Sequence, residues 1–321
     1  MTKSLFKGMG ICLVFSLLCP LPASAQRYPD PDKFLTIIAI VAAGGNSDMQ
    51  IRAIAPHLSK HLGGTKIMVE NIPGASGKIA YEKAYRARPD GYLLLNYNLP
   101  APIVTEVAEP GVRYKTADFV PVYGISSVPN VLVVNSDTWK TVDEFIEEAK
   151  RRTVTIGTTG NKTANYLQAV AFAEAVKIKA NFVPFGGGAE SVQTLAGKHI
   201  DAVCTTVLSA FPLVRAGKLR PLMVFSDEPD ATYPGVLLSK DSKWEIATFP
   251  LLGTYGAPPK LSPDKVKALE DAFAKSLKEP AFLDWAKKMN FDITPMNASK
   301  VKDLTTTFYR DIDKYQVFFP K

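Results

Sequence analysis

Short β-rich runs alternate with helical segments along most of this 321-residue chain, and this alternation limits the fold more than any other feature. Apolar runs rich in β-branched residues predict buried strands at 35–41, 66–71 and 92–98. The segments between them, 48–62 and 77–87, predict helices. Because strands that alternate with helices form parallel sheets with helical layers on their faces, the pattern predicts an α/β fold. The expected buried face of the first helix consists of Ile51, Ile54, Leu58 and Leu62.

Two β-rich passages without helices interrupt this alternation. The first covers residues 119–135, after which Thr141 and Glu144 form a capping box that predicts the start of a new helix. The second covers residues 247–258, and the helical remainder opens with Ser262 as the expected N-cap. Two α/β halves joined by two extended passages indicate two domains connected by a two-strand hinge.

The position of these passages predicts a discontinuous first domain. It comprises residues 26–126 and 249–321, and the second domain, residues 127–248, is inserted into it. A cleft between two domains linked by a hinge suits a ligand that is enclosed by closure.

The first 25 residues have the features of a secretory signal peptide. Lys3 and Lys7 precede an apolar run over 11–18, and the sequence Ala23-Ser24-Ala25 provides a cleavage site after Ala25. The run is short for a membrane anchor, and the bulky residues before Cys19 disfavour a lipoprotein site. We therefore expect a soluble protein exported to the periplasm.

Charge and cysteine content exclude several classes of protein. Removal of Lys3 and Lys7 lowers the formal charge from +7 to +5, because 7 − 2 = 5. The remaining basic residues are dispersed among acidic ones, so we expect no nucleic-acid partner, while a mild positive field favours anionic solutes. Cys12 and Cys19 fall in the signal peptide, and Cys204 alone cannot form an internal disulfide.

A paired-glycine loop follows the first predicted strand. Gly44 and Gly45 permit backbone angles that would direct amides toward a cleft, at a place where a helix begins. Ser47 or Asp48 is expected to cap that helix, which gives Asp48 a structural role. The Rossmann pattern G-x-G-x-x-G is absent, and residues 74–78 (GASGK) lack the spacing of a phosphate-binding P-loop.

Three ordered motifs resemble the extracytoplasmic solute receptors of tripartite tricarboxylate transporters, often called Bug receptors. The first is Gly44-Gly45-Asn46-Ser47-Asp48, which resembles the family's Gly-Gly-x-x-Asp loop. The others are MVENIPGASGKIA at 68–80 and ARPDGYLLL at 87–95. The segment IGTTGNKTANYLQ at 156–168 also resembles a family loop, and the similarity extends over essentially all of the chain after the signal peptide.

This resemblance implies a type II periplasmic-binding-protein fold, no catalysis, and a small carboxylated ligand in the cleft. Family members hold a ligand carboxylate with backbone amides and ordered waters at the Gly-Gly loop and at loops of the second domain. The chain departs from the family at Ile40-Val41-Ala42-Ala43, where Pro-Phe-Pro-Pro is usual, and at Lys162, where glycine is frequent. Lys162 would reach either an anion or solvent.

The candidate ligand-binding residues lie at the ends of predicted strands and in the loops that follow them. Hydroxyls and amides there would donate to a carboxylate without charge. The candidates are Ala43, Gly44, Gly45, Asn46, Ser47, Asp48, Asn98, Thr158, Thr159, Gly160, Thr163, Phe185, Gly186, Gly187, Thr205 and Thr206. We expect no catalytic residue, no metal site and no cofactor.

The histidines and the remaining cysteine give no sign of another chemistry. His57 and His61 stand four residues apart on one helix, but Leu58 occupies the position that the metalloprotease pattern gives to glutamate. A surface pair is the preferred interpretation. Cys204 lies in an apolar strand, where a thiol is usually inert, and the hydrolase pattern G-x-S-x-G does not occur.

Together, the sequence features and the resemblance predict a periplasmic receptor, which we expect to be a monomer. It would capture a small organic acid by domain closure and deliver it to the membrane subunits of a tripartite tricarboxylate-type transporter. A receptor of the same fold for a neutral or aromatic compound, or a sensor subunit for a signalling partner, remains an alternative. An exported hydrolase is disfavoured.

Overall fold

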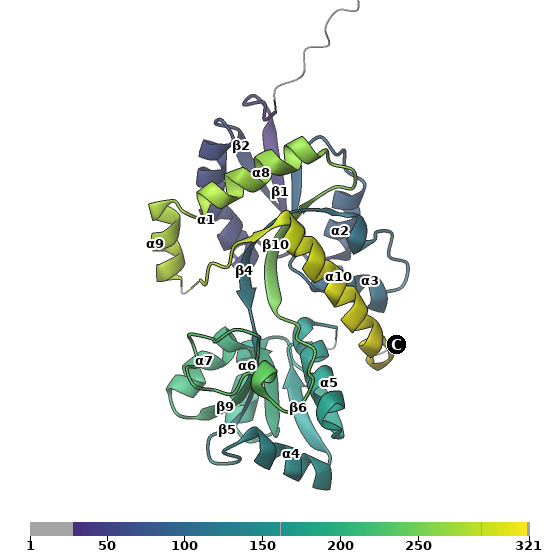
Figure 1. Cartoon of the computed structure of the whole chain (residues 1–321), viewed down its shortest axis with the longest axis vertical. Helices are drawn as coiled ribbons and strands as arrows, with labels where there is room; N and C mark the ends of the chain where they lie inside the picture. Colours follow the sequence, from purple (N-terminus) through teal and green to yellow (C-terminus); the bar gives the residue numbers. More distant parts are fainter. Residues whose placement is uncertain (1–27, 161, 290, 320–321) are drawn as a thin grey trace, which may run out of the picture.

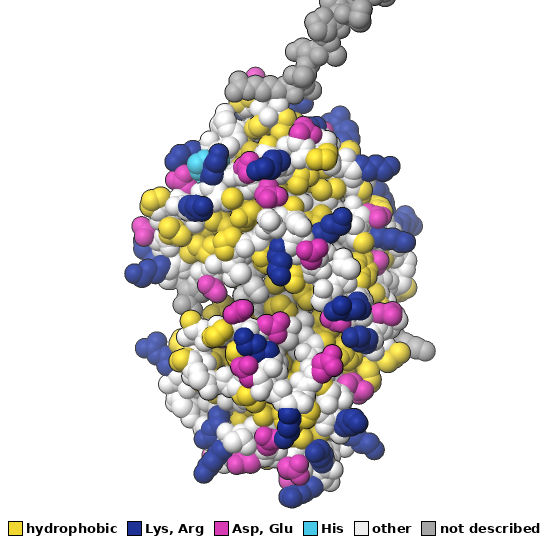
Figure 2. Space-filling view, in the orientation of Figure 1, with side chains coloured by type: hydrophobic (Ala, Val, Ile, Leu, Met, Phe, Trp, Pro, Cys, Tyr) yellow, Lys and Arg dark blue, Asp and Glu magenta, His cyan; other side chains and the backbone are white. Residues whose placement is uncertain are grey.

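The computed structural model describes residues 28–160, 162–289 and 291–319. Two lobes lie one above the other along the long axis, each built on its own β-sheet (Figure 1). The predicted signal peptide and its cleavage site lie outside the described residues. On the face drawn in Figure 2, acidic and basic side chains alternate over both lobes.

Lobe 1 contains a six-stranded sheet in the order β11-β4-β10-β3-β1-β2. β1 pairs in parallel with β2 and β3, as the βαβαβ pattern predicted, and β10 and β4 join antiparallel beyond them. The strands are β1 (Phe34–Ala39), β2 (Lys66–Asn71), β3 (Leu93–Asn96), β4 (Val120–Val128), β10 (Leu251–Ala257) and β11 (Met296–Asn297).

Helices cover both faces of this sheet. The predicted apolar face of the first helix is confirmed, since Ile51, Ile54 and Leu58 have no exposed surface and Leu62 has 2%. One cluster of buried side chains includes α1, α8 and α9, and the other includes α2, α3 and α10. The helices are α1 (Asn46–His61), α2 (Lys78–Tyr85), α3 (Ala101–Ala108), α8 (Pro263–Ser276), α9 (Pro280–Lys288) and α10 (Ala298–Tyr315).

Lobe 2 contains a five-stranded sheet in the order β7-β6-β8-β5-β9. Its strands are β5 (Asn130–Asn135), β6 (Val154–Thr158), β7 (Ala180–Pro184), β8 (Ala202–Thr206) and β9 (Leu219–Phe225). Its helices are α4 (Val142–Arg151), α5 (Ala164–Val176), α6 (Gly188–Ala196) and α7 (Val207–Arg215). The capping prediction for α4 is confirmed, because the Thr141 side chain accepts the Glu144 amide at 3.2 Å.

Two extended passages join the lobes, as the sequence indicated. β4 stays in the sheet of lobe 1 up to Val128, and β5 begins in the sheet of lobe 2 at Asn130, so Pro129 alone separates them. The return passage runs from the end of β9 to β10. The end of α10 reaches α5 of lobe 2, where the Tyr166 hydroxyl donates to the Phe318 carbonyl at 2.5 Å (Figure 1).

Three details differ from the sequence-based expectation. The eight-residue helix α3 was not predicted, because its mostly apolar run APIVTEVA spans only about two turns, too few to establish a helical period. Ser262 occupies the N-cap of α8, but its side chain makes no capping hydrogen bond. α1 begins at Asn46 with Gly45 at the N-cap, so the expected cap by Ser47 or Asp48 is wrong.

None of the described helices combines the length and apolar character that a bilayer span requires.

Candidate functional site

The candidate ligand-binding residues fall at the carboxyl ends of five strands, two in lobe 1 and three in lobe 2. In α/β sheets this edge is where ligands bind, outside the strands and at the start of the following helices. In lobe 1 these are β1 and β3, and in lobe 2 they are β6, β7 and β8. Helices α1, α5, α6 and α7 each start directly after one of the five strands or its loop.

The paired-glycine loop folds on itself. Gly44 has φ +81°, in the left-handed region that favours glycine, and its amide donates to the Asp48 carboxylate at 2.9 Å. The Gly45 amide donates to the Ala42 carbonyl at 3.0 Å. The expectation that these two amides point into the cleft is therefore wrong in this structure. The first-turn amides of α1, which have no intrahelical acceptor, are the donors that this loop leaves at the strand end.

Asp48 holds the loop, the helix and the neighbouring strand together, which confirms its structural role. Its carboxylate accepts from the Arg52 guanidinium at 3.0 Å, from the Gly44 amide, and from the Asn71 side chain at 2.9 Å. The Asn71 side chain also donates to the Val41 carbonyl at 3.0 Å. The Arg52 hydrogen bond is the largest cause that lowers the pKa of this buried carboxyl to about 2, followed by the Gly44 and Asn71 donors.

Ser47 and Asn98 come together although 51 residues separate them. The Asn98 side-chain amide donates to the Ser47 hydroxyl at 2.8 Å, which ties the end of β3 to the first turn of α1. Asn98 itself adopts φ +34°, an uncommon value for a residue other than glycine. The structure thus places these two candidates side by side in lobe 1.

The candidates after β6 form a loop whose hydroxyls are already engaged. The Thr158 hydroxyl donates to the Gly160 carbonyl at 2.9 Å, and the Thr159 hydroxyl donates to the Asn165 side chain. The Thr163 hydroxyl accepts the Tyr166 amide at 3.2 Å and so caps α5, as expected. Thr158 and Thr159 therefore do not offer the free O–H donors that the sequence suggested.

The starts of α6 and α7 meet at the end of β8. A Cβ added to Gly188 would lie 2.4 Å from the Ser209 Oγ and 3.0 Å from the Thr205 Oγ1, so only glycine allows this approach. Thr206 caps α7 and lies 2.9 Å from the Ser209 hydroxyl. The Thr205 Oγ1 is buried and has no hydrogen-bond partner among the described residues. Ser209 was not a candidate, because nothing in its local sequence marks it.

The loop after β7 also turns its amides inward. The Phe185 amide donates to the Thr158 carbonyl at 2.8 Å, and the Gly186 amide donates to the Glu190 carboxylate at 2.8 Å. Both amides were expected to face the cleft, and this expectation is wrong here. Gly187 occupies the N-cap of α6 without a side-chain cap, so the first-turn amides of α6 remain.

Lys162 connects lobe 2 to lobe 1. Its Nζ donates to the Ala108 carbonyl at 3.2 Å and to the Glu109 carboxylate at 3.1 Å, both at the end of α3 in lobe 1. Of the two outcomes considered for Lys162, an anion or solvent, the structure shows an anion, but one supplied by the protein. The contact holds the β6–α5 loop against lobe 1.

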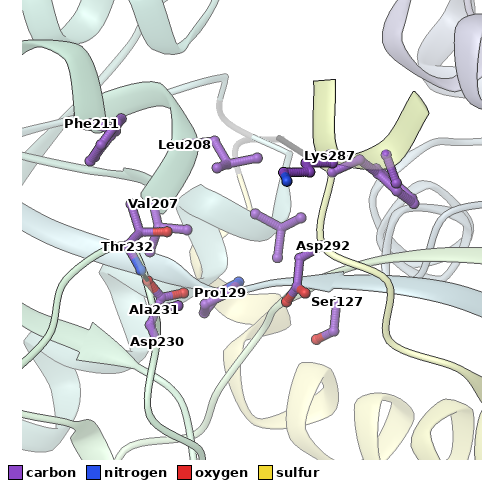
Figure 3. Close-up of a pocket in the computed structure, with 13 residues that line it drawn as sticks. Ser127, Pro129, Val207, Leu208, Phe211, Asp230, Ala231, Thr232, Lys287 and Asp292 are labelled. Carbon is purple, nitrogen blue, oxygen red and sulfur yellow. Dashed lines mark hydrogen bonds between the residues drawn. The ribbon is translucent and has the colours of Figure 1, made fainter. Parts of the chain in front are cut away.

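A cavity of about 370 Å³ opens between the lobes beside the first crossover (Figure 3). Lobe 2 contributes Val207, Leu208 and Phe211, and lobe 1 contributes Lys287 and Asp292. None of the candidate residues lines this cavity, although Thr206 directly precedes Val207 at its wall. The cavity is therefore adjacent to the end of β8 but is not formed by the candidate residues.

Comparison with known proteins decides what kind of protein carries this arrangement. The profile of the tripartite tricarboxylate transporter family receptors matches residues 50–311. A UPF0065 protein from the gbd 5′ region of Cupriavidus necator is 30% identical over 292 residues, which cover 88% of this chain and 86% of that protein. The chain belongs to this receptor family.

Other relatives and solved structures agree with this assignment. The BugT protein of Bordetella pertussis is 28% identical over 222 residues, 67% of each chain. A crystal structure of a TctC solute-binding protein from Polaromonas has 27% identity and a TM-score of 0.80, and it covers 91% of this chain and 99% of its own. The protein is thus a solute-binding receptor of the periplasmic type, and the predicted fold class is confirmed.

Two more distant structures share the fold. MatC from Rhodopseudomonas palustris with bound malate has 21% identity and a TM-score of 0.69 over 91% of this chain and 100% of its own. An R. palustris protein with adipate has 23% identity and a TM-score of 0.71 over 90% and 97%.

Two histidines of the receptor are engaged, and its cysteine is buried, whereas His199 is exposed. The His61 ring lies 2.6 Å from the Glu279 carboxylate, and the His57 ring packs edge-on against Phe282. Cys204 has no exposed surface, and burial raises the pKa of its thiol. Among the residues that the structure describes, no three His, Cys, Asp or Glu side chains gather in a way that would hold a metal ion.

The receptor also contains a network of buried amide side chains at the hinge that sequence reasoning missed. Asn165 donates to Asn130 at 2.5 Å, and Asn130 donates to the Phe249 carbonyl at 2.7 Å. Gln168 binds the return passage, because it accepts the Phe249 amide at 2.8 Å and donates to the Ala247 carbonyl at 3.0 Å. The partners are 35 to 119 residues apart, so no local pattern signals them.

Proposed function

We propose that this receptor captures a small carboxylated organic acid between its lobes, closes on it, and delivers it to the membrane subunits of a tripartite tricarboxylate-type transporter without chemical change. The observation that carries the proposal is that helices of both lobes start at the strand ends where the candidate residues lie. α1 from lobe 1 and α5, α6 and α7 from lobe 2 all begin at the strand ends that carry the candidate residues.

Helix starts are suited to a carboxylate. The first amides of a helix lack intrahelical acceptors, and the helix dipole gives that end a partial positive charge. Four loop amides already donate to groups within the protein: those of Gly44, Gly45, Phe185 and Gly186. The first-turn amides of α1 and α6 would therefore be the donors to the ligand. A ligand held from both lobes would favour the closed arrangement, because it binds that arrangement more tightly than the open one.

The relatives with organic acids support this ligand class. MatC binds malate and another fold relative was solved with adipate, and both molecules are small carboxylic acids. The family description itself names a receptor of a tricarboxylate transporter. The first turns of α1 and α6 offer backbone amides, and the acidic side chains beside them, Asp48 and Glu190, already accept hydrogen bonds within the protein, which is compatible with an anionic ligand.

The remaining features of the proposal are the expectations stated for the sequence. The moving units would be residues 26–126 with 249–321 and residues 127–248, which rotate about the passages at Pro129 and before β10. The protein would act as a monomer in the periplasm after cleavage behind Ala25. The match to a family of receptors supports a role without catalytic activity, and the His61 ring and the buried thiol of Cys204 are compatible with it.

Calorimetric titration with a panel of mono-, di- and tricarboxylates tests the proposal. We expect at least one acid to bind with a stoichiometry of one. Mass spectrometry of the mixture after the titration should recover that acid with its mass unchanged. Binding of none of the acids, together with binding of a neutral or aromatic compound of similar size, would refute the carboxylate assignment. Turnover of a bound acid would refute the receptor role.

A further inference from the structure

In the chain of hydrogen bonds at the hinge, a backbone carbonyl determines which group donates and which accepts in each bond. The carbonyl of Phe249 can only accept, so the Asn130 side chain must present its Nδ2 to it, at 2.7 Å. The other end of the same amide, the Asn130 Oδ1, then faces Asn165. Because an oxygen there requires a donor, Asn165 must present its Nδ2, at 2.5 Å.

The same reasoning continues to the candidate loop. With its Nδ2 directed at Asn130, the Asn165 side chain turns its Oδ1 toward Thr159. That oxygen accepts, so the Thr159 hydroxyl has to donate its single proton inward. The orientation of every group from Thr159 to Phe249 is therefore set by one carbonyl of the return passage.

Burial makes this direction costly to reverse. Asn130 has no exposed surface and Asn165 has 8%, so neither amide can turn over without leaving a buried polar atom unpaired. Phe249 is fixed in turn, because Gln168 bonds its amide and its ring stacks on Phe308 at a centroid distance of 6.3 Å. Thr159 is half-buried at the end of β6, in the loop that Lys162 holds against lobe 1.

We propose that the Thr159 hydroxyl faces the cleft as a hydrogen-bond acceptor, and that the receptor selects organic acids that carry a hydroxyl group beside the carboxylate. The inward donation leaves only oxygen lone pairs for the ligand. A carboxylate oxygen opposite Thr159 would meet those lone pairs and be repelled, whereas an alcohol O–H would be accepted. This inference rests on the proposed function, because it names the ligand class of the same cleft.

Matched pairs of acids that differ by one hydroxyl test the inference: malate with succinate, lactate with propionate, and citrate with its deoxy analogue. Calorimetry on the full receptor is expected to show tighter binding of the hydroxylated member of the pair that binds best, by about tenfold, the size of one hydrogen bond to a partly buried group. Three variants identify the origin of the preference. Thr159→Val removes the acceptor, Asn165→Ala frees the hydroxyl to donate outward, and Thr306→Val, on the exposed face of α10, is the matched control.

We expect the preference to vanish in Thr159→Val, to fall or reverse in Asn165→Ala, and to persist in Thr306→Val. If Asn165→Ala unfolds, Thr159→Val still decides the question. Equal affinities within every pair for the wild-type receptor, or a preference that survives Thr159→Val, would overturn the inference while the proposed function stands. If none of the six acids binds but another carboxylate of the broader panel does, the inference is overturned and the proposed function stands. If no carboxylate of that panel binds and a neutral compound does, both are overturned.

Discussion

The ion pair between Lys162 and Glu109 is predicted to hold the two lobes together in the absence of ligand. Lys162 belongs to the β6–α5 loop of lobe 2, and its Nζ lies 3.1 Å from the Glu109 carboxylate and 3.2 Å from the Ala108 carbonyl in lobe 1. Replacement by methionine keeps the length of the side chain and removes its charge and donors. Lys162→Met is therefore the perturbation that acts on this contact and on little else.

The expected magnitude follows from exposure. The Lys162 and Glu109 side chains are 23% and 31% exposed, so this pair is neither fully solvated nor buried. A solvated surface pair contributes up to about 1 kcal/mol, and a buried charged hydrogen bond contributes about 1.5–3 kcal/mol. We adopt about 1 kcal/mol for the contact after allowing for solvent screening, and this corresponds to a roughly fivefold change in the ratio of closed to open receptor.

Small-angle X-ray scattering of the ligand-free receptor measures this ratio. We expect Lys162→Met to increase the radius of gyration, and high salt to do the same in the wild type while leaving the variant nearly unchanged, because salt screens the pair. Lys198→Met is the matched control, since Lys198 pairs with Asp137 inside lobe 2. Identical scattering from wild type and Lys162→Met at low salt would refute the role of this contact.

Three further predictions concern single residues. Asp48→Asn should lower the free energy of unfolding by about 2 kcal/mol at neutral pH, because the folded-state pKa of about 2 lies below the unfolded value of 3.8. This stabilisation is present above pH 4 and is lost as the pH falls through 2, so the unfolding free energies of variant and wild type, measured by urea titration, should converge there. A constant difference between them down to pH 2 would contradict the assignment. Gly45→Val should weaken binding of the best acid more than tenfold and leave the far-UV circular dichroism unchanged. The added Cβ would lie 3.0 Å from the Ala42 carbonyl oxygen and from the Val41 Cγ2, so the loop would have to shift. Unchanged affinity would show that this loop does not belong to the binding site. The Cys204 thiol should react with Ellman's reagent only after unfolding, because it is buried and its pKa is raised; rapid labelling of the native receptor would disprove this.

The sequence predicted the fold well because the relevant signals are local. A helical period placed Ile51, Ile54 and Leu58 on one buried face, and the two helix-free passages marked the crossovers between the sheets. α3 was missed because a mostly apolar run of about two turns is too short to establish a period. Local reasoning also located the loops at the strand ends, which is where the candidate residues lie.

The same reasoning failed on which groups of the site are free to bind. Gly44, Gly45, Thr158 and Thr159 looked like available donors, yet each is bonded within the protein. Whether an amide or hydroxyl has a partner depends on tertiary placement, which no local pattern records. The hinge amides show the same limit, since Asn130 and its acceptor Phe249 are 119 residues apart in the sequence.

A crystal structure of the receptor with its tightest organic acid tests the central claim most directly. The account predicts a carboxylate within hydrogen-bond distance of first-turn amides of α1 in lobe 1 and, at the same time, of α5, α6 or α7 in lobe 2. It would be contradicted by an acid bound in the cavity beside Pro129 and Phe211 without contact to those helix starts, or by an acid held by one lobe alone.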